Sequence, residues 1–115
     1  MKSRFILVAL AIITSVGCNN HKQALEDHSP AGKIFRQSCA ACHGIDGEGL
    51  VIGGKAVPNL KKGKAQSDSD QRLKQQIEDG GKGMPPFRFE LTPDQIDDVV
   101  RFIRTFQTAD NSPKS

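Results

Sequence analysis

Glycine and proline interrupt much of the middle of this chain, and they limit what it can fold into. Residues 44–63 contain Pro58 and six of the 11 glycines, and residues 82–91 contain one more glycine and two adjacent prolines. Neither stretch has the apolar periodicity of a helix or a strand, so both are predicted to be long loops and no strand is predicted. A domain of about 78 residues with two such loops buries little apolar surface by itself. We therefore expect a bound group to sit between the loops.

Three segments outside these loops carry helix signals. The first has Ser29 as its N-cap and Pro30 in its first turn, and it is predicted to run into Cys39. The second spans residues 68–79, with a serine as its cap and two glycines from Gly80 as its stop signal.

The last helix is the clearest of the three. Thr92 is its N-cap, Pro93 begins it, and Gln95 is placed to complete a capping box. Its apolar residues form one stripe that we expect to be buried: Ile96, Val99, Val100, Phe102, Ile103 and Phe106. Its charged residues are expected to face water: Asp94, Asp97, Asp98, Arg101 and Arg104. The predicted fold class is therefore all-α, with one domain over residues 31–108 and a flexible C-terminal tail over residues 109–115.

Cys39-Ala40-Ala41-Cys42-His43 has the spacing C-x-x-C-H, which is the attachment signature of haem c. Two intervening residues bring both sulfurs to one face, where they can add to two vinyl groups, and His43 can place a ring nitrogen on the iron. A zinc site would need a second pair of ligands, and Cys18 is the only other cysteine. A redox dithiol needs a βαβ setting, and a Cys39–Cys42 disulfide would give His43 no role. The motif therefore predicts one haem c, covalently attached through Cys39 and Cys42.

Met84 is the candidate for the second axial ligand, because it is the only methionine besides Met1. A thioether is a soft ligand that suits low-spin iron. Gly83 before it and Pro85 and Pro86 after it predict a stiff loop that can approach a flat ring closely. The alternative is that Met84 fills a gap in the core.

Together, these pieces resemble a class I cytochrome c of the short, mono-haem bacterial type. The resemblance covers Ala31 to about Thr108 and rests on several segments in the family's order: Gly32-Lys33-Ile34-Phe35, Cys39 to Gly44, Val57-Pro58-Asn59-Leu60, Gly83 to Phe87, and Val99-Val100-Arg101-Phe102-Ile103. It implies the class I cytochrome c fold, in which three main helices and two Gly/Pro loops surround one covalently bound haem.

The resemblance also implies particular contacts. The first and last helices are expected to cross near Gly32, with Phe35 and Phe102 at the contact. The Pro58 carbonyl is expected to accept the other ring N–H of His43, which would fix its tautomer; otherwise Pro58 is an ordinary turn residue. Members of the family often hold the haem propionates with Trp or Tyr, which this chain lacks. The candidates in their place are Asn59, Lys61, Gln71 and Arg72.

A haem iron with both axial positions filled has no open site for a substrate, which favours electron transfer over catalysis. We therefore expect a one-electron carrier in an exported respiratory or related redox chain, and not an enzyme. Two alternatives remain: a haem-bearing subunit of a larger membrane complex, and a haem sensor or enzyme in which Met84 is displaced. Three lysines cluster after Leu60: Lys61, Lys62 and Lys64. They either steer docking to an acidic redox partner or simply belong to a solvated loop.

Residues 1–17 are typical of an export signal. Lys2 and Arg4 precede an apolar segment that is shorter than the roughly 20 residues a membrane-spanning helix needs. Ser15-Val16-Gly17-Cys18 resembles the lipobox of bacterial lipoproteins, so Cys18 is predicted to be the lipidated first residue of the mature chain, with an ordinary secretory signal as the alternative. Residues 18–30 are predicted to be a polar tether. We expect the protein at the periplasmic face of a bacterial membrane, lipid-anchored, or otherwise soluble in the periplasm.

The charge of the chain argues against nucleic-acid binding. The formal net charge is +3, and the export signal accounts for two of the positive charges. The rest of the chain is nearly neutral and has no concentrated basic stripe. We expect a monomer whose partners are redox proteins.

Overall fold

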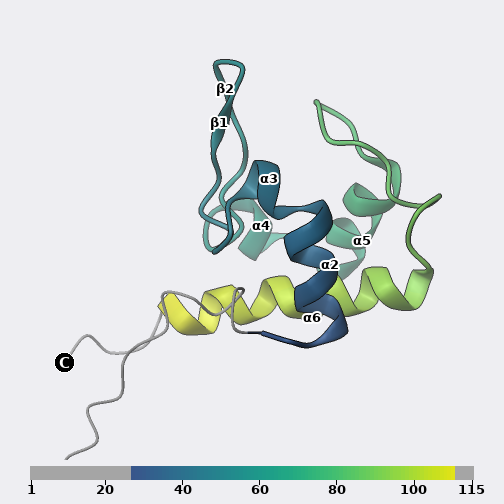
Figure 1. Cartoon of the computed structure of the whole chain (residues 1–115). Coiled ribbons are helices and arrows are strands. Elements are labelled where there is room, and N and C mark those ends of the chain that lie inside the picture. The colour runs from purple at the N-terminus through teal and green to yellow at the C-terminus, as the bar shows by residue number, and fades with distance from the viewer. Residues whose placement is uncertain (1–26, 111–115) are drawn as a thin grey trace, which may run out of the picture.

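The computed structural model describes residues 27–110; the predicted export signal, Cys18 and residues 111–115 lie outside this range. In chain order the elements are α2 (Pro30–Ser38), α3 (Ala40–His43), β1 (Val51–Ile52), β2 (Lys55–Ala56), α4 (Lys64–Ser67), α5 (Asp70–Asp79) and α6 (Pro93–Asp110). α6 forms the base of the molecule, and both the β1–β2 hairpin and the loop between α5 and α6 extend at the end opposite to it (Figure 1). None of the helices in the described range is long and apolar enough to span a bilayer.

The three predicted helices are present, and their caps explain their starts. The hydroxyl of Ser29 accepts the Gly32 N–H at 3.1 Å at the start of α2. α2 ends at Ser38, one residue before the predicted end, and Cys39 is its C-cap, with a φ of −118° that departs from the value of a regular helix. α5 begins two residues later than predicted, at Asp70, because Ser69 is its cap and accepts the Arg72 N–H at 3.3 Å.

The capping box of α6 is formed as predicted. The Thr92 N–H donates to Gln95 Oε1 at 2.9 Å, and the Gln95 N–H donates to Thr92 Oγ1 at 3.3 Å. These reciprocal bonds fix the start of the helix that carries most of the core. All six residues of its predicted apolar stripe are buried.

The prediction that the chain has no strand is wrong. β1 and β2 pair antiparallel, with Val51 opposite Ala56 and Ile52 opposite Lys55. Gly53 and Gly54 form the two-residue turn, and their φ values of +56° and +77° are those that a tight hairpin requires. The short helices α3 and α4 are also additional to the prediction. The architecture is still predominantly helical, with one small sheet.

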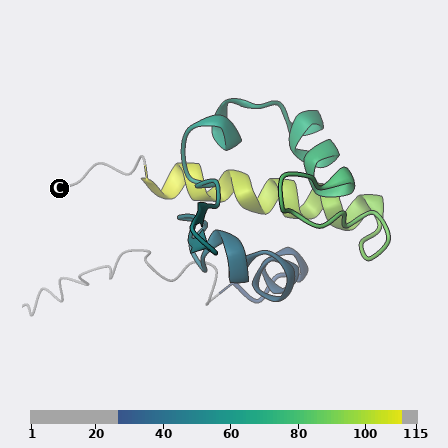
Figure 2. The same cartoon turned by 90° about the horizontal axis from the view of Figure 1, so that it is seen from above.

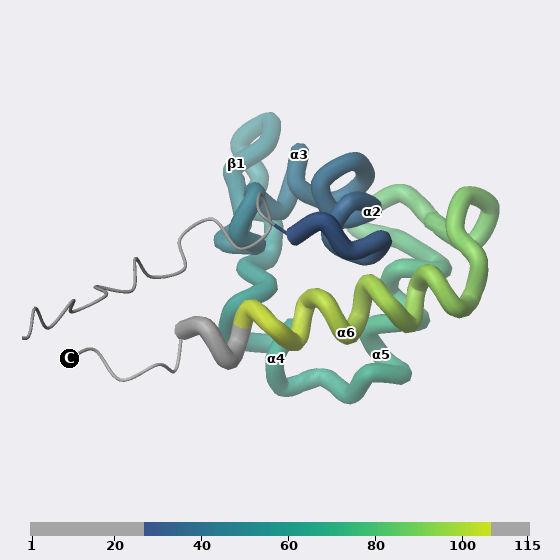
Figure 3. The backbone as a smooth tube through the Cα atoms, turned by 60° about the horizontal axis from the view of Figure 1, so that its bottom comes forward, coloured from purple at the N-terminus to yellow at the C-terminus, as the bar shows by residue number. Residues whose placement is uncertain are grey.

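The core lies where α2 crosses α6. Phe35 of α2 is fully buried, and its ring centroid lies 5.4 Å from that of Phe102 and 5.2 Å from that of Phe106. α2 and α3 lie on one side of α6, whereas α4 and α5 lie on the other (Figures 2 and 3). Gly32 is buried as expected, but the nearest atoms that a Cβ would meet belong to Asp27 and not to α6.

One charged residue of α6 does not face water as predicted. The side chain of Arg104 is only 25% exposed, because it lies against the α4–α5 connection. The carboxylate of Asp97 pairs with Lys74 of α5 at 2.5 Å, and Arg101 pairs with Asp98 on the same helix.

Candidate functional site

Of the two cysteines of the attachment motif, Cys39 is the N-cap of the single-turn helix α3 and Cys42 lies within it. Cys39 is the residue before the turn and packs against the core, whereas Cys42 is exposed. Both cysteines are free of disulfide bonds. Burial raises the pKa of the Cys39 thiol to about 11, so this thiol is neutral at physiological pH. The His43 N–H donates to the Cys39 carbonyl at 2.9 Å, which fixes the histidine on the same turn as both sulfurs.

His43 makes the hydrogen bond that the family resemblance implies. Its Nδ1 lies 3.0 Å from the carbonyl oxygen of Pro58. Because a carbonyl only accepts hydrogen bonds, Nδ1 carries the proton, and Nε2 has its lone pair free for a metal. The hydrogen bond also orients the ring and raises the basicity of the free nitrogen.

The hairpin segment is joined directly to the attachment motif. The Gly49 N–H donates to the His43 carbonyl at 2.7 Å, and the Leu50 N–H donates to the Cys42 carbonyl at 3.2 Å. Gly49 has a φ of +79°, and a Cβ on it would lie 3.1 Å from the Asn59 nitrogen, so the two chain segments pass closely here. Sequence reasoning missed this hairpin, although two adjacent glycines after two β-branched residues were a usable signal.

The Met84 loop is held in one shape by its own backbone. The Gly81 N–H donates to the Met84 carbonyl at 2.8 Å, and the Met84 N–H donates back to the Gly81 carbonyl at 3.1 Å. Lys82 and Gly83 form the turn between them, with φ values of +55° and +96°. The Phe87 N–H then donates to the Ile77 carbonyl at 3.0 Å, which joins the loop to α5. Met84 is therefore presented on a fixed turn, half-buried against the core.

Gln76 is a residue beside Met84 that the sequence did not single out. Its side-chain amide donates to the Gly80 carbonyl at 2.9 Å and lies 4.0 Å from the Met84 sulfur. This amide supports the start of the loop and points the positive end of its dipole towards the thioether.

The structure presents the predicted site residues at one end of the molecule. Cys42 and His43 lie in α3, Cys39 directly precedes it, and Pro58 follows the hairpin, whereas the α5–α6 loop supplies Met84. The hairpin and the α5–α6 loop both extend away from α6 (Figure 1). Of the four propionate candidates, Gln71 and Arg72 are exposed on the first turn of α5, and Lys61 and Asn59 are half-buried. Asn59 Oδ1 accepts the Lys61 N–H at 2.8 Å.

This arrangement fits a haem better than a bare metal ion. Within residues 27–110, no three His, Cys, Asp or Glu side chains gather into a cluster that could hold an ion alone. A haem brings four nitrogen ligands and needs only two from the protein, and its attachment needs two unpaired thiols. Apolar side chains beside the motif are exposed, with Leu50 at 38% and Ile52 at 46% of their surface, and a porphyrin ring can cover such side chains.

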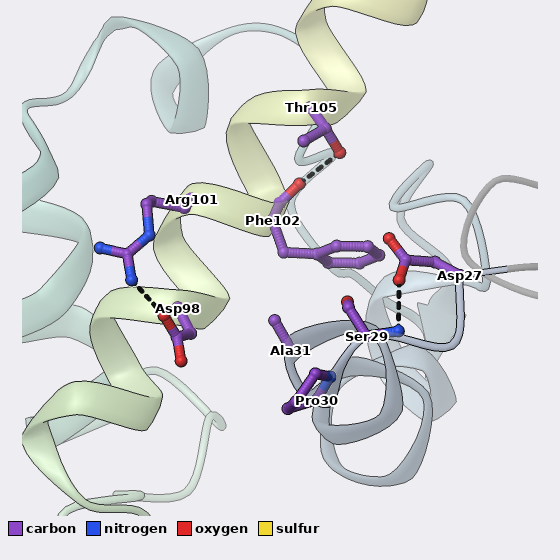
Figure 4. Close-up of a pocket in the computed structure, with 8 residues that line it drawn as sticks. All are labelled: Asp27, Ser29, Pro30, Ala31, Asp98, Arg101, Phe102 and Thr105. Atoms are coloured by element: carbon purple, nitrogen blue, oxygen red, sulfur yellow. Dashed lines mark hydrogen bonds and ion pairs between the residues drawn. The ribbon is translucent and has the colours of Figure 1, made fainter.

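A separate cavity of about 330 Å³ lies between the start of α2 and α6 (Figure 4). Its lining includes Asp27, Ser29, Arg101 and Phe102, and none of the predicted site residues belongs to it. Asp27 accepts the Ser29 N–H at 2.7 Å, and hydrogen bonds from Ser29 hold the pKa of this carboxyl below its usual value. The cavity therefore belongs to the capping of α2 rather than to the candidate site.

Comparisons with known proteins point to the same cofactor. The model of the family described as "Cytochrome C oxidase, cbb3-type, subunit III" matches residues 26–103. Cytochrome c6 of Nostoc sp. is 31% identical over 103 residues, covering 90% of this chain and 92% of that protein. Cytochrome c6 of Thermostichus vulcanus is 33% identical over 104 residues, covering 90% and 91%.

A solved structure agrees with these sequence relatives. The c-type cytochrome KustC0563 superposes with a TM-score of 0.59 at 33% identity, covering 65% of this chain and 94% of that one. The chain therefore belongs to the cytochrome c family, as a small class I cytochrome c.

Proposed function

We propose that this protein is a one-electron carrier whose covalently attached haem c is bound through Cys39 and Cys42 and ligated by His43 and Met84. The haem supplies an iron that cycles between Fe(II) and Fe(III). The chain's part is to hold both ligands in place, so that the iron changes charge with little change in geometry. The hydrogen bond from His43 to the Pro58 carbonyl carries this proposal most directly, because it leaves Nε2 oriented and free for the iron.

Filled axial positions favour transfer over catalysis. His43 is fixed by Pro58, and Met84 lies on a turn closed by two backbone hydrogen bonds. If both residues ligate the haem iron, they would leave no open coordination position for a substrate or a gas. The homologues carry the name cytochrome c6, which agrees with a carrier.

An optical and redox titration tests the proposed function. We expect low-spin bands, a methionine–Fe(III) charge-transfer band in the oxidised protein, and a reversible titration of one electron per chain. Met84→Ala should abolish the charge-transfer band, whereas haem attachment should persist. High-spin bands, or ready CO binding by the unmodified protein, would instead support the sensor or enzyme alternative.

We further propose that the mature protein is exported and carries a lipid on Cys18. Support comes from the basic start, the short apolar segment and the lipobox-like Ser15-Val16-Gly17-Cys18. Intact mass of the protein from membranes should show cleavage before Cys18 and added acyl chains. Cys18→Ala should release the protein from the membrane fraction; an unchanged distribution would contradict the anchor.

The redox partner is expected to dock through an acidic surface onto the lysines of the hairpin and of the segment that follows it. All charged residues between positions 50 and 64 are lysines: Lys55, Lys61, Lys62 and Lys64. Lys64 is paired with Asp68 at 2.8 Å, and no ion pair of the other three is recorded among residues 27–110. Because this stretch includes Pro58, the lysines lie on the segment that contacts His43, where they can attract an acidic surface.

Ionic strength tests this docking proposal. The rate of electron transfer to an acidic partner should fall with added salt, and Lys61→Gln with Lys62→Gln should flatten that dependence. Lys33→Gln, at an exposed position of α2, is the matched control and should leave the salt dependence unchanged. A rate that is indifferent to salt in the unmodified protein would remove the docking proposal.

A further inference from the structure

Arg104 reaches from α6 into the segment that connects the hairpin to α5. Its guanidinium donates to three backbone carbonyls: Ala65 at 2.9 Å, Gln66 at 3.3 Å and Asp68 at 2.6 Å. It also pairs with the Asp70 carboxylate at 2.9 Å. The planar guanidinium presents several N–H groups at fixed angles, which allows one side chain to serve acceptors spread over this turn.

These acceptors are groups that the local structure leaves without partners. α4 is a single turn, so the carbonyls of its last residues have no partner within the helix. Arg104 serves two of them, and it then pairs with the first residue of α5, Asp70. One side chain therefore joins α4, α5 and α6.

The α4 turn is connected in the other direction to the candidate site. The Gln66 side-chain amide donates to the Leu60 carbonyl, and the Leu60 N–H donates to the Gly47 carbonyl at 2.7 Å. Leu60 lies two residues after Pro58, whose carbonyl accepts the ring Nδ1–H of His43. A continuous set of hydrogen bonds and short backbone steps thus runs from Arg104 to His43.

α6 is a suitable anchor for this path. Phe102 and Phe106, which flank Arg104 along the helix, are buried and pack on each other and on Phe35. A Cβ on Gly47 would lie 3.0 Å from the Phe106 ring, so the loop after the attachment motif also rests directly on α6. The base of the path is therefore more constrained than the loop that it supports.

We propose that Arg104 is a positioning residue for His43: it holds residues 60–70 against α6 and thereby keeps the Pro58 carbonyl on His43 Nδ1. This inference rests on the proposed role of His43 as an axial ligand. Because the bond at Nδ1 raises the basicity of Nε2, holding it favours Fe(III) and lowers the reduction potential. Arg104 sets that potential without touching the haem ligand itself.

The test compares two arginines of the same helix in the haem-loaded protein. Arg104→Met keeps a long apolar stem but removes every donor, whereas Arg101→Met is the matched control, since Arg101 is 71% exposed and its recorded ion pair is with Asp98 (Figure 4). In Arg104→Met, amide hydrogen exchange over residues 57–68 should become about tenfold faster, as expected when several hydrogen bonds to a charged group are lost. The reduction potential should rise in this variant and stay unchanged in Arg101→Met.

A second variant covers the case in which Arg104→Met does not fold. Arg104→Lys keeps the cation, but one ammonium cannot span acceptors from Ala65 to Asp70, so exchange over residues 57–68 should be faster and the reduction potential higher than in the wild type. Wild-type exchange over residues 57–68, or faster exchange with an unchanged potential, would overturn the proposal. A wild-type spectrum without histidine ligation would instead refute the proposed function.

Discussion

The backbone of the Met84 loop makes Gly80 far less tolerant of a side chain than Gly63. The two glycines have almost the same conformation, with φ 66° and ψ −147° at Gly80 and φ 66° and ψ −142° at Gly63. For residues other than glycine, this region of φ and ψ costs about 1–3 kcal/mol of conformational free energy. Alanine at either position therefore carries the same conformational cost.

The two sites differ in what an added Cβ would meet. At Gly63 it would meet nothing within 4 Å, whereas at Gly80 it would overlap the Met84 carbonyl oxygen and lie 2.7 Å from Pro85 C and Pro86 N. Relief requires a shift of the backbone that carries Met84, and overpacking of this kind costs about 1–3 kcal/mol. We expect Gly80→Ala to lower the free energy of unfolding by about 1–3 kcal/mol more than Gly63→Ala does.

Guanidinium unfolding followed by far-UV circular dichroism measures this difference, and near-infrared absorbance reports the methionine–Fe(III) bond. Gly80→Ala should weaken or abolish the charge-transfer band while the haem stays covalently attached. Gly63→Ala should keep the band at full intensity. Equal losses of stability in the two variants, with the band intact in both, would refute the account of the Met84 loop.

Three further substitutions test single contacts. Pro58→Ala keeps the carbonyl, so the reduction potential should be unchanged, while unfolding free energy falls by about 0.4–1 kcal/mol through a more flexible unfolded chain; a large shift of potential would contradict a role for the carbonyl alone. Gln76→Leu removes the amide dipole 4.0 Å from the Met84 sulfur, so the potential measured by titration should fall; a rise would show that the dipole is not the cause. Hydrogen bonds from Ser29 hold the Asp27 pKa below its usual 3.8. Their contribution to the stability of the folded protein is therefore complete above pH 3.8 and is lost as the pH falls through the lowered pKa. The midpoint temperature of thermal unfolding should therefore be lower in Asp27→Ala than in the wild type at pH 7, and this difference should shrink below pH 3.8. A difference that does not change with pH would contradict the linkage between the Asp27 pKa and stability.

The parts that the sequence predicted well depend on neighbouring residues. The capping box of Thr92 and Gln95 and the serine cap of α2 are local signals, and the structure contains both. The attachment motif is local in the same sense, because Cys39 and His43 lie on one turn. The His43–Pro58 bond joins residues 15 apart and followed from the family resemblance rather than from any spacing.

The parts that were missed depend on distant backbone groups or on a turn type. Glycine usually breaks regular structure, so the sequence predicts a loop where the hairpin lies, although two adjacent glycines with positive φ also form the turn of a two-residue hairpin. The helical pattern places Arg104 on the solvent face of α6. The carbonyls that it contacts instead lie 36 to 39 residues earlier in the chain. Carbonyls are present in every residue, so the sequence carries no signature of such a contact.

Intact mass and absorbance of the protein, produced together with a working haem-attachment system, show whether one haem is bound through both cysteines. We expect a mass increase of one haem, a low-spin spectrum, and no alkylation of Cys39 or Cys42 after denaturation. A colourless protein with both of these thiols open to alkylation would contradict this expectation.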